Sequence, residues 1–224
     1  MFDFNTIKEV SLAKGGHFRA ADGMCFMEMA AWFAGEEHTD KPECVSTVLG
    51  KFGIVLNDNM EKDTRDLLLK PLIPLVVGTY DPENELRRAE FLVMWVINKI
   101  LPLNLRLHGY DKLATLCESA DNLTNARVAV KKVWFKAPSS CTEQAELSFS
   151  YFNLSYYSNE HVVTAAGLAI TAAAQELTGC ANRQIWETAV EGLRQAILIG
   201  RHDGFDASID LTERHKELCE LVSA

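Results

Sequence analysis

Apolar residues recur at helical spacing along most of this 224-residue chain. The clearest run follows Asp40 and Glu43, whose separation of three residues is typical of a capping box at a helix start. The apolar positions of this run fall three or four residues apart, as on one face of an α-helix: Val45, Val48, Leu49, Phe52, Val55 and Leu56. The pattern predicts an amphipathic helix packed against a core.

Similar start and stop signals divide the rest of the chain. Asp81-Pro82 opens a segment whose apolar period lasts until Pro102, and Asn122 opens a valine-rich segment that keeps the helical period to about residue 136. Further helices are expected over residues 24–34, ended by Gly35, from Thr142, and over 159–179, 182–200 and 210–221. Since strand signals are scarce, the sequence predicts an all-α protein with a single compact domain of about eight to ten helices over residues 1–224 and a weak seam at 137–141.

Charge and composition narrow the expected partners. The net charge of −9 works against binding to nucleic acid, which requires clustered Lys and Arg. No apolar run reaches the roughly 18 residues of a membrane span. No basic segment precedes an apolar one at the N-terminus, and the six cysteines form no C-x-x-C pair, as is typical of free thiols in a reducing compartment. We therefore expect a cytoplasmic protein with no nucleic acid and no membrane as partner.

Several large enzyme classes lack their sequence signature here. The chain contains no G-x-G-x-x-G, no G-x-x-x-x-G-K-[ST], no H-E-x-x-H and no G-x-S-x-G. Dinucleotide binding, P-loop chemistry, zincin proteolysis and the nucleophile elbow therefore lose support.

Residues 15–44 hold the densest cluster of side chains capable of acid–base chemistry or metal binding. The members of this cluster are His17, Cys25, Glu28, Glu36, Glu37, His38, Asp40, Glu43 and Cys44. Two His and two Cys could together bind zinc, so His17, Cys25, His38 and Cys44 are candidate ligands, although their spacing matches no standard zinc pattern. The simpler expectation is that no cofactor is bound.

Glu28 is the most unusual member, because residues 24–34 are otherwise apolar on all sides. A buried carboxylate must be paired, hydrogen-bonded or neutral. Glu28 is therefore a general acid or base, a ligand, or a structural acceptor that binds backbone N–H groups of the following loop or pairs with Arg19 or Arg65.

Cys25 and Asp40 complete the possible catalytic set. Cys25 lies in the first turn of the expected helix, where the helix dipole favours a thiolate, and His17 could act as its base. The alternative for Cys25 is a small core residue. Asp40 would join Glu28 as the second acid–base group.

Two polar loops are candidates for contact with a ligand or partner. The first consists of Glu36, Glu37, His38, Thr39 and Asp40, which otherwise serve as a turn and a helix cap. The second covers residues 201–206 and contains one His and two acids.

Residues 15–80 contain a combination of short motifs. They are Gly15-Gly16-His17, Cys25 with Glu28, Ala34-Gly35-Glu36, Asp40-Lys41-Pro42-Glu43-Cys44, Asn57-Asp58, Arg65, Leu72-Ile73-Pro74 and Gly78-Thr79. The combination resembles a family of uncharacterised proteins from actinobacteria and phages. The chain departs from that pattern with Thr39 for the usual Ser, Lys41 where His is common and Thr47 where a proline often follows. The resemblance implies an origin in a phage or mobile element and no particular activity.

The sequence thus favours a non-catalytic, acidic helical protein that acts by protein–protein binding, such as a phage or mobile-element accessory or host-interaction factor. The alternative is a metal- or Cys/Glu-dependent hydrolase that uses the cluster at 15–44. Mimicry of nucleic acid by acidic helices has less support, because the acids are dispersed along the chain.

Overall fold

Helices account for all the regular secondary structure of the described residues in the computed structural model, which are 10–137, 141, 158–175 and 177–201. This confirms the predicted all-α class. The expected helices from Thr142 and over 210–221 lie outside these residues, as do positions 138–140 of the seam and 202–206 of the second polar loop.

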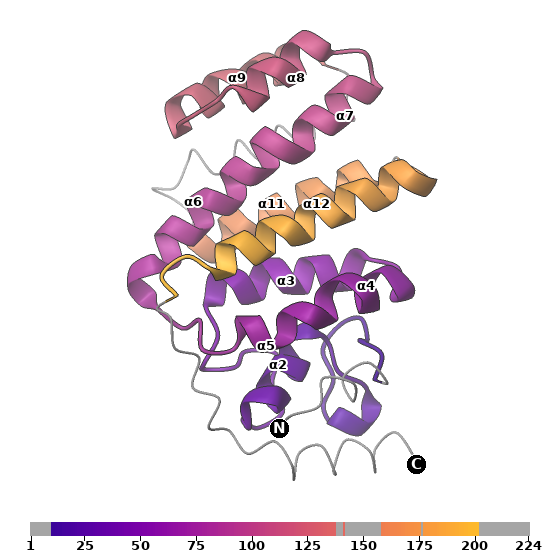
Figure 1. Cartoon of the computed structure of the whole chain (residues 1–224), viewed down its shortest axis with the longest axis vertical. Coiled ribbons are helices and arrows are strands. Elements are labelled where there is room, and N and C mark those ends of the chain that lie inside the picture. The colour runs from indigo at the N-terminus through magenta and orange to yellow at the C-terminus, as the bar shows by residue number, and fades with distance from the viewer. Residues whose placement is uncertain (1–9, 138–140, 142–157, 176, 202–224) are drawn as a thin grey trace.

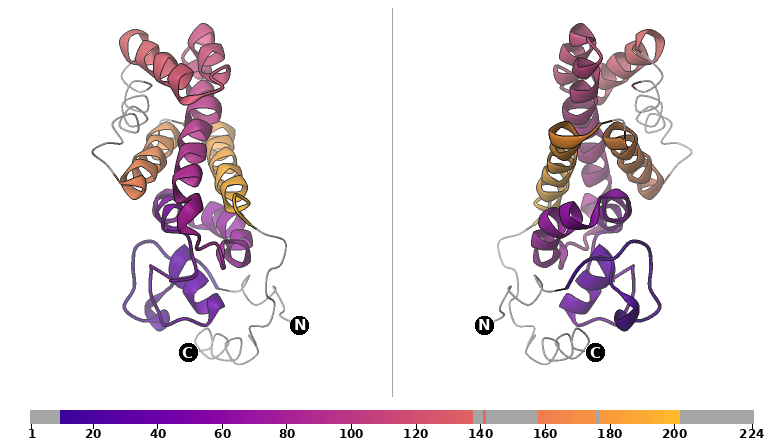
Figure 2. Two further views of the ribbon diagram at one scale, coloured as in Figure 1. Left: turned by 90° about the vertical axis from the view of Figure 1, so that its left-hand side faces the viewer. Right: turned by 90° about the vertical axis from the view of Figure 1, so that its right-hand side faces the viewer.

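A long helical rod runs along the molecule (Figure 1). It consists of α6 (Glu85–Trp95), a π-helical segment η4 (Val96–Ile100) and α7 (Leu101–Leu107). Helices α11 (Asn159–Gln175) and α12 (Gly179–Ile197) flank the rod on opposite sides (Figure 2). Both also pack on α3 (Thr47–Asn59), so these helices form the middle of the fold.

Shorter helices form the two ends of the described structure. At one end, α8 (Asp111–Glu118) packs on α7 and on α9 (Leu123–Lys136). At the other, α2 (Phe26–Ala34) packs on α3 and on α5 (Ile73–Val76). Helix α4 (Lys62–Leu69) continues into a 3-10 turn, η2 (Lys70–Leu72), and two more such turns, η1 (Ala20–Asp22) and η3 (Pro82–Asn84), precede α2 and α6.

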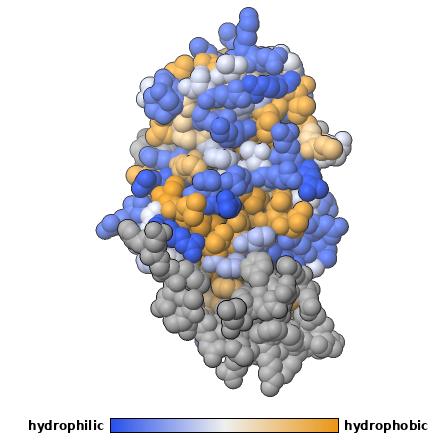
Figure 3. Space-filling view, in the orientation of Figure 1, coloured by the Kyte–Doolittle hydropathy of each residue, from blue (hydrophilic) through white to orange (hydrophobic). Residues whose placement is uncertain are grey.

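The core contains buried apolar side chains from helices that are distant in sequence. Phe26, Phe52, Leu56, Ile97 and Leu193 are completely buried. On the face shown in Figure 3, apolar residues also gather across the middle of the molecule, while hydrophilic residues prevail toward the end formed by α7 and α8. Among the described helices, none is both long enough and apolar enough to cross a bilayer.

Three predicted helix boundaries are wrong. Helix α3 is capped by Ser46, whose hydroxyl accepts the N–H of Leu49, and not by a box of Asp40 and Glu43. The rod does not stop at Pro102, because the preceding π-helical turn widens the backbone where a proline would otherwise crowd it. Helix α12 begins at Gly179, with Thr178 as N-cap, and not at Asn182.

A buried arginine joins segments that are distant in sequence. Arg88 is 1% exposed and donates hydrogen bonds to the carbonyl oxygens of Thr79 at 2.7 Å and Ile199 at 2.9 Å. It also pairs with Glu85 at 3.0 Å. Glu85 in turn accepts the N–H of Val48 at 2.9 Å, so this pair ties the start of α6 to the start of α3 and the end of α12.

Glycines set the closest helix approaches. A Cβ atom on Gly167 of α11 would lie 2.8 Å from a methyl carbon of Val55 in α3. A Cβ atom on Gly192 of α12 would lie 2.6 Å from Cδ1 of Trp95 in α6. These two glycines therefore let neighbouring helices approach closely on two sides of the core.

We expect Gly192→Ala to lower the free energy of unfolding by about 1–3 kcal/mol, because overpacking at Trp95 outweighs the gain in helix propensity. Urea denaturation measures the change. Gln184→Ala, at an exposed position of α12, is the matched control and should stay within about 0.5 kcal/mol of the wild type. Equal stability of the two variants would contradict the close contact.

Candidate functional site

The carboxylate of Glu28 is the centre of the candidate site. It is 1% exposed and accepts the backbone N–H groups of His17 at 2.5 Å and Cys25 at 2.7 Å. Nδ1 of His17 lies 2.8 Å from the same carboxylate, and Nε2 of His38 lies 3.6 Å from it. Three hydrogen bonds therefore offset the free-energy cost of burying this carboxylate.

Cys25 and Glu28 form a capping box at the start of α2. Cys25 is the N-cap, and its Sγ accepts the N–H of Glu28 at 3.5 Å while the Glu28 side chain accepts the N–H of Cys25. Ser or Thr usually takes the first position of such a box. The C-x-x-E spacing thus has a structural explanation, with a thiol in place of the hydroxyl.

Hydrogen bonding decides the charge of Glu28. Burial raises the pKa of this carboxyl, but the hydrogen bonds from Cys25 and His17 outweigh burial and hold the pKa below its ordinary value of 4.5. Glu28 is therefore ionised at neutral pH. An ionised carboxylate only accepts hydrogen bonds, so Nδ1 of His17 donates to Glu28.

The partners of Glu28 differ from those expected of a structural acceptor. The N–H groups belong to the segment before α2 and not to the loop after it. Arg19 instead pairs with Asp22 at 3.0 Å, and Arg65 donates to the carbonyl oxygen of Asn57 at 3.0 Å.

Cys25 does not fit the role of an activated nucleophile. Burial and the negative charge of Glu28 raise the pKa of its thiol to about 12, despite its place at a helix N-terminus. The thiol is therefore protonated at neutral pH, and His17 directs its Nδ1 to Glu28 rather than to the sulfur. The packing of α2 thus overrides the helix dipole.

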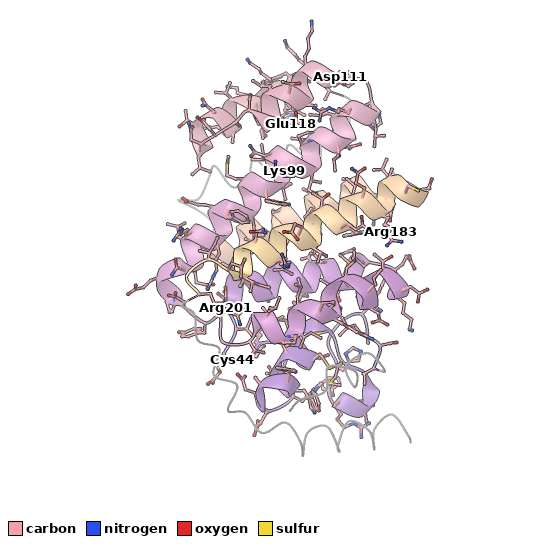
Figure 4. The ribbon with its side chains drawn as sticks, in the orientation of Figure 1. Cys44, Lys99, Asp111, Glu118, Arg183 and Arg201 are labelled. Atoms are coloured by element: carbon pink, nitrogen blue, oxygen red, sulfur yellow. The ribbon has the colours of Figure 1, made fainter. Side chains whose placement is uncertain are left out.

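Glu36 closes the loop between α2 and α3. Its carboxylate accepts the N–H groups of Glu43 at 2.8 Å and Cys44 at 3.0 Å. Burial and the neighbouring Glu36 raise the pKa of the Cys44 thiol to about 12. Cys44 lies on this loop (Figure 4) and belongs to the surroundings of Glu36, not of Glu28.

The four candidate zinc ligands are therefore divided between two places. His17, Cys25 and His38 surround Glu28, whereas Cys44 lies beside Glu36. Among the described residues, no group of three or more His, Cys, Asp and Glu side chains has an arrangement that could hold a metal ion.

The remaining members of the first polar loop have different surroundings. Nε2 of His38 lies 2.9 Å from the carbonyl oxygen of His17, which fastens the loop to the segment before α2. Glu37 is exposed. Asp40 is half-buried and lines a cavity of about 280 Å³ that also contacts Glu43 and Tyr80.

Asn57 and Asp58, at the end of α3, hold the chain around His17 in place. In the sequence, only the combination of motifs at residues 15–80 includes these two residues. Asn57 is completely buried, accepts the N–H of Phe26 at 3.2 Å and donates to the carbonyl oxygen of Ala13 at 2.8 Å. Asp58 accepts the N–H of Gly15 at 2.8 Å. The Asn-Asp pair thus holds the chain that carries His17, a role that a helical pattern alone does not reveal.

No protein-family model, no curated protein and no solved structure matches this chain.

We expect Glu28→Gln to lower the free energy of unfolding at neutral pH by about 2–4 kcal/mol, because an amide cannot accept all three hydrogen bonds. The folded-state pKa of Glu28 lies below 4.5, so the carboxylate stabilises the fold above about pH 4.5 and loses this effect as pH falls through the folded value. Urea denaturation at a series of pH values should show wild type and variant converging in acid.

Glu37→Gln, at an exposed position of the next loop, is the control and should unfold like the wild type. A gap between wild type and Glu28→Gln that persists unchanged in acid would contradict an ionised, hydrogen-bonded Glu28.

We expect iodoacetamide at neutral pH to alkylate Cys180, which is exposed, much faster than Cys25, Cys44 or Cys117. Burial raises the pKa of each of these three thiols to about 12, so the reactive thiolate is scarce. Peptide mass spectrometry over a time course gives the order of labelling. Rapid labelling of Cys25 in the folded protein would restore it as a nucleophile.

Proposed function

We propose that the protein is a non-catalytic, acidic helical protein that acts by binding another protein. Its resemblance to actinobacterial and phage proteins supports a role as a phage or mobile-element accessory or host-interaction factor. A cytoplasmic location fits the five cysteines of the described residues, all of which are free thiols.

The cavity beside the loop between α2 and α3 is the observation on which this proposal rests. Its apolar part is formed by Met27, Val45 and Ile54, and charged side chains of the loop, among them Asp40 and Lys41, stand around it. An apolar centre with a polar rim is the usual composition of a protein interface. The volume of about 280 Å³ lies below the range of about 300–1,000 Å³ found for most small-molecule sites, and it fits one or two side chains of a partner.

The loop is organised before any partner binds. Glu36 fixes its two ends through the N–H groups of Glu43 and Cys44, and His38 fastens its middle to His17. The N–H of Tyr80 donates to the carbonyl oxygen of Cys44 at 3.0 Å, which holds the tyrosine at the cavity. A loop already in one conformation loses little entropy on binding.

Tyr80 is the contact residue that this arrangement favours. It lines the cavity and is 61% exposed, so its ring is available to a partner. Exposed tyrosines beside pockets are frequent contributors to binding energy at interfaces.

We expect Tyr80→Ala to lose a protein partner that the wild type captures. The measurement is affinity purification from the source organism with quantitative mass spectrometry, comparing wild type, Tyr80→Ala and Leu67→Ala. Leu67 is 58% exposed on α4, does not line the cavity, and serves as the control. The proposal fails if no protein is enriched by wild type and control over Tyr80→Ala.

An enzyme remains the second candidate because of the His17–Glu28 pair. A buried carboxylate that fixes Nδ1 of a histidine leaves Nε2 as a base, as in the dyads of many hydrolases. The non-catalytic proposal would be overturned if the purified protein hydrolysed a nucleotide, ester or phosphodiester at a rate abolished by Glu28→Gln and by His17→Gln. Elemental analysis addresses the metal-dependent form, which needs more than about a tenth of an equivalent of a transition metal.

A further inference from the structure

Positive charge is concentrated in one part of this acidic chain. Residues 99–137 contain seven Lys and Arg and only three Asp and Glu, in a chain whose net charge is −9. These residues include α7, α8 and α9, which form the end of the described structure opposite to α2 (Figures 1 and 2). The molecule therefore has a basic end, while the rest of the chain carries the acidic excess.

Helix α9 holds most of this positive charge. It contains Arg127, Lys131, Lys132 and Lys136 and no acidic residue. Of the three acids nearby, Glu118 is bound on both oxygens by Arg106 at 2.6 Å, and Asp121 accepts hydrogen bonds from the side chains of two asparagines. Figure 4 shows Glu118 and Asp111 on α8, with Lys99 on the rod.

The outward face of α9 has an apolar ridge between basic side chains. The helix buries Ala126, Ala129, Val130 and Val133. On the outward face, Val128 is 47% exposed and Phe135 is 74% exposed. They are seven residues apart, so they lie on one line along the helix, and at 100° per residue Lys131 and Lys132 fall on opposite sides of that line.

We propose that this face of α9 docks on an anionic phospholipid membrane, with Val128 and Phe135 entering the interface and the lysines contacting lipid phosphates. Apolar side chains flanked by lysines are the pattern of helices that lie in the membrane plane. The ring of Trp134 stacks on Phe135 at 6.0 Å between centroids, which adds aromatic surface at the end of the ridge.

The position of α9 favours a planar partner. Helix α9 lies at one end of the long axis of the described structure, where a surface as large as a membrane can approach it (Figure 1). The acidic excess lies in the rest of the sequence, and at physiological salt the repulsion between charges decays over about 8 Å. A nucleic acid would meet the lysines too, but phosphate contacts would leave the exposed valine and phenylalanine without a role.

A helix can bind to the surface of a membrane in a protein that has no membrane-spanning segment. The sequence expectation of no membrane partner rested on the length of apolar runs, which a helix lying on the surface does not require. This inference is independent of the cavity near Tyr80, because it concerns the other end of the molecule.

The test is co-flotation of the intact protein with vesicles. We expect binding to phosphatidylcholine vesicles that contain about a third of phosphatidylserine, no binding to pure phosphatidylcholine, and weaker binding at high salt. Lys131→Glu combined with Lys132→Glu should lower the binding to anionic vesicles at least about tenfold. Phe135→Ser should lower it about fivefold.

Lys14→Glu combined with Lys62→Glu is the matched control. It changes the net charge equally at two exposed positions outside α9 and outside the cavity, and it should bind within about twofold of the wild type. Thermal unfolding verifies that each variant folds. Failure of the wild type to bind anionic vesicles at low salt, or equal loss in the control, would overturn the proposal. Tighter binding to a single-stranded oligonucleotide, lost in the Lys131 and Lys132 variant, would assign the face to nucleic acid instead.

Discussion

A buried carboxylate must find hydrogen-bond donors, and the N-terminal third of this fold is arranged around that requirement. Glu28 lies in a helix that is otherwise apolar and fully enclosed. Its donors come from the preceding segment, which has little regular structure and whose backbone N–H groups therefore need partners outside a helix. The same hydrogen bonds give the buried carboxylate its donors and give the N–H groups of that segment an acceptor. Glu28 consequently fixes where the chain around His17 lies and how α2 begins.

Other motifs of residues 15–80 also use a polar side chain to bind backbone groups of an irregular segment. Asn57 and Asp58 bind the backbone at residues 13–15, and Glu36 binds the backbone at residues 43 and 44. Thr79 accepts the N–H of Ser46 at 3.1 Å. Each polar side chain joins a stretch of irregular backbone to a helix or to another loop. The combination of motifs therefore has a structural meaning that holds whether or not the region also binds a ligand.

The sequence predicted the helices well because periodicity and caps are local signals. Asn122 caps α9, Gly35 ends α2 in a left-handed conformation, and the valine-rich run is helical, all as expected. The failures involve competition between signals. Asp40 and Glu43 match a capping box, but Ser46 lies closer to the first buried turn of α3 and is its cap. Because thiols rarely serve as helix caps, the sequence does not indicate that Cys25 is the N-cap of α2. The sequence shows the density of reactive side chains at 15–44. Their division between the surroundings of Glu28 and those of Glu36 depends on the path of the loop between α2 and α3, for which there is no local sequence signal.

Whole-chain charge does not describe each surface, because folding separates charges that an average combines. The acidic excess argues against a nucleic-acid partner, while α9 collects four basic residues at one end of the described structure. The loop that carries Asp40 and Cys44 lies toward the other end (Figure 4). If α9 rests on an anionic membrane, the contact with lipid and the cavity at Tyr80 lie toward opposite ends of the described structure. The two proposed surfaces then operate together, because the first orients the molecule and the second is left open to a protein partner.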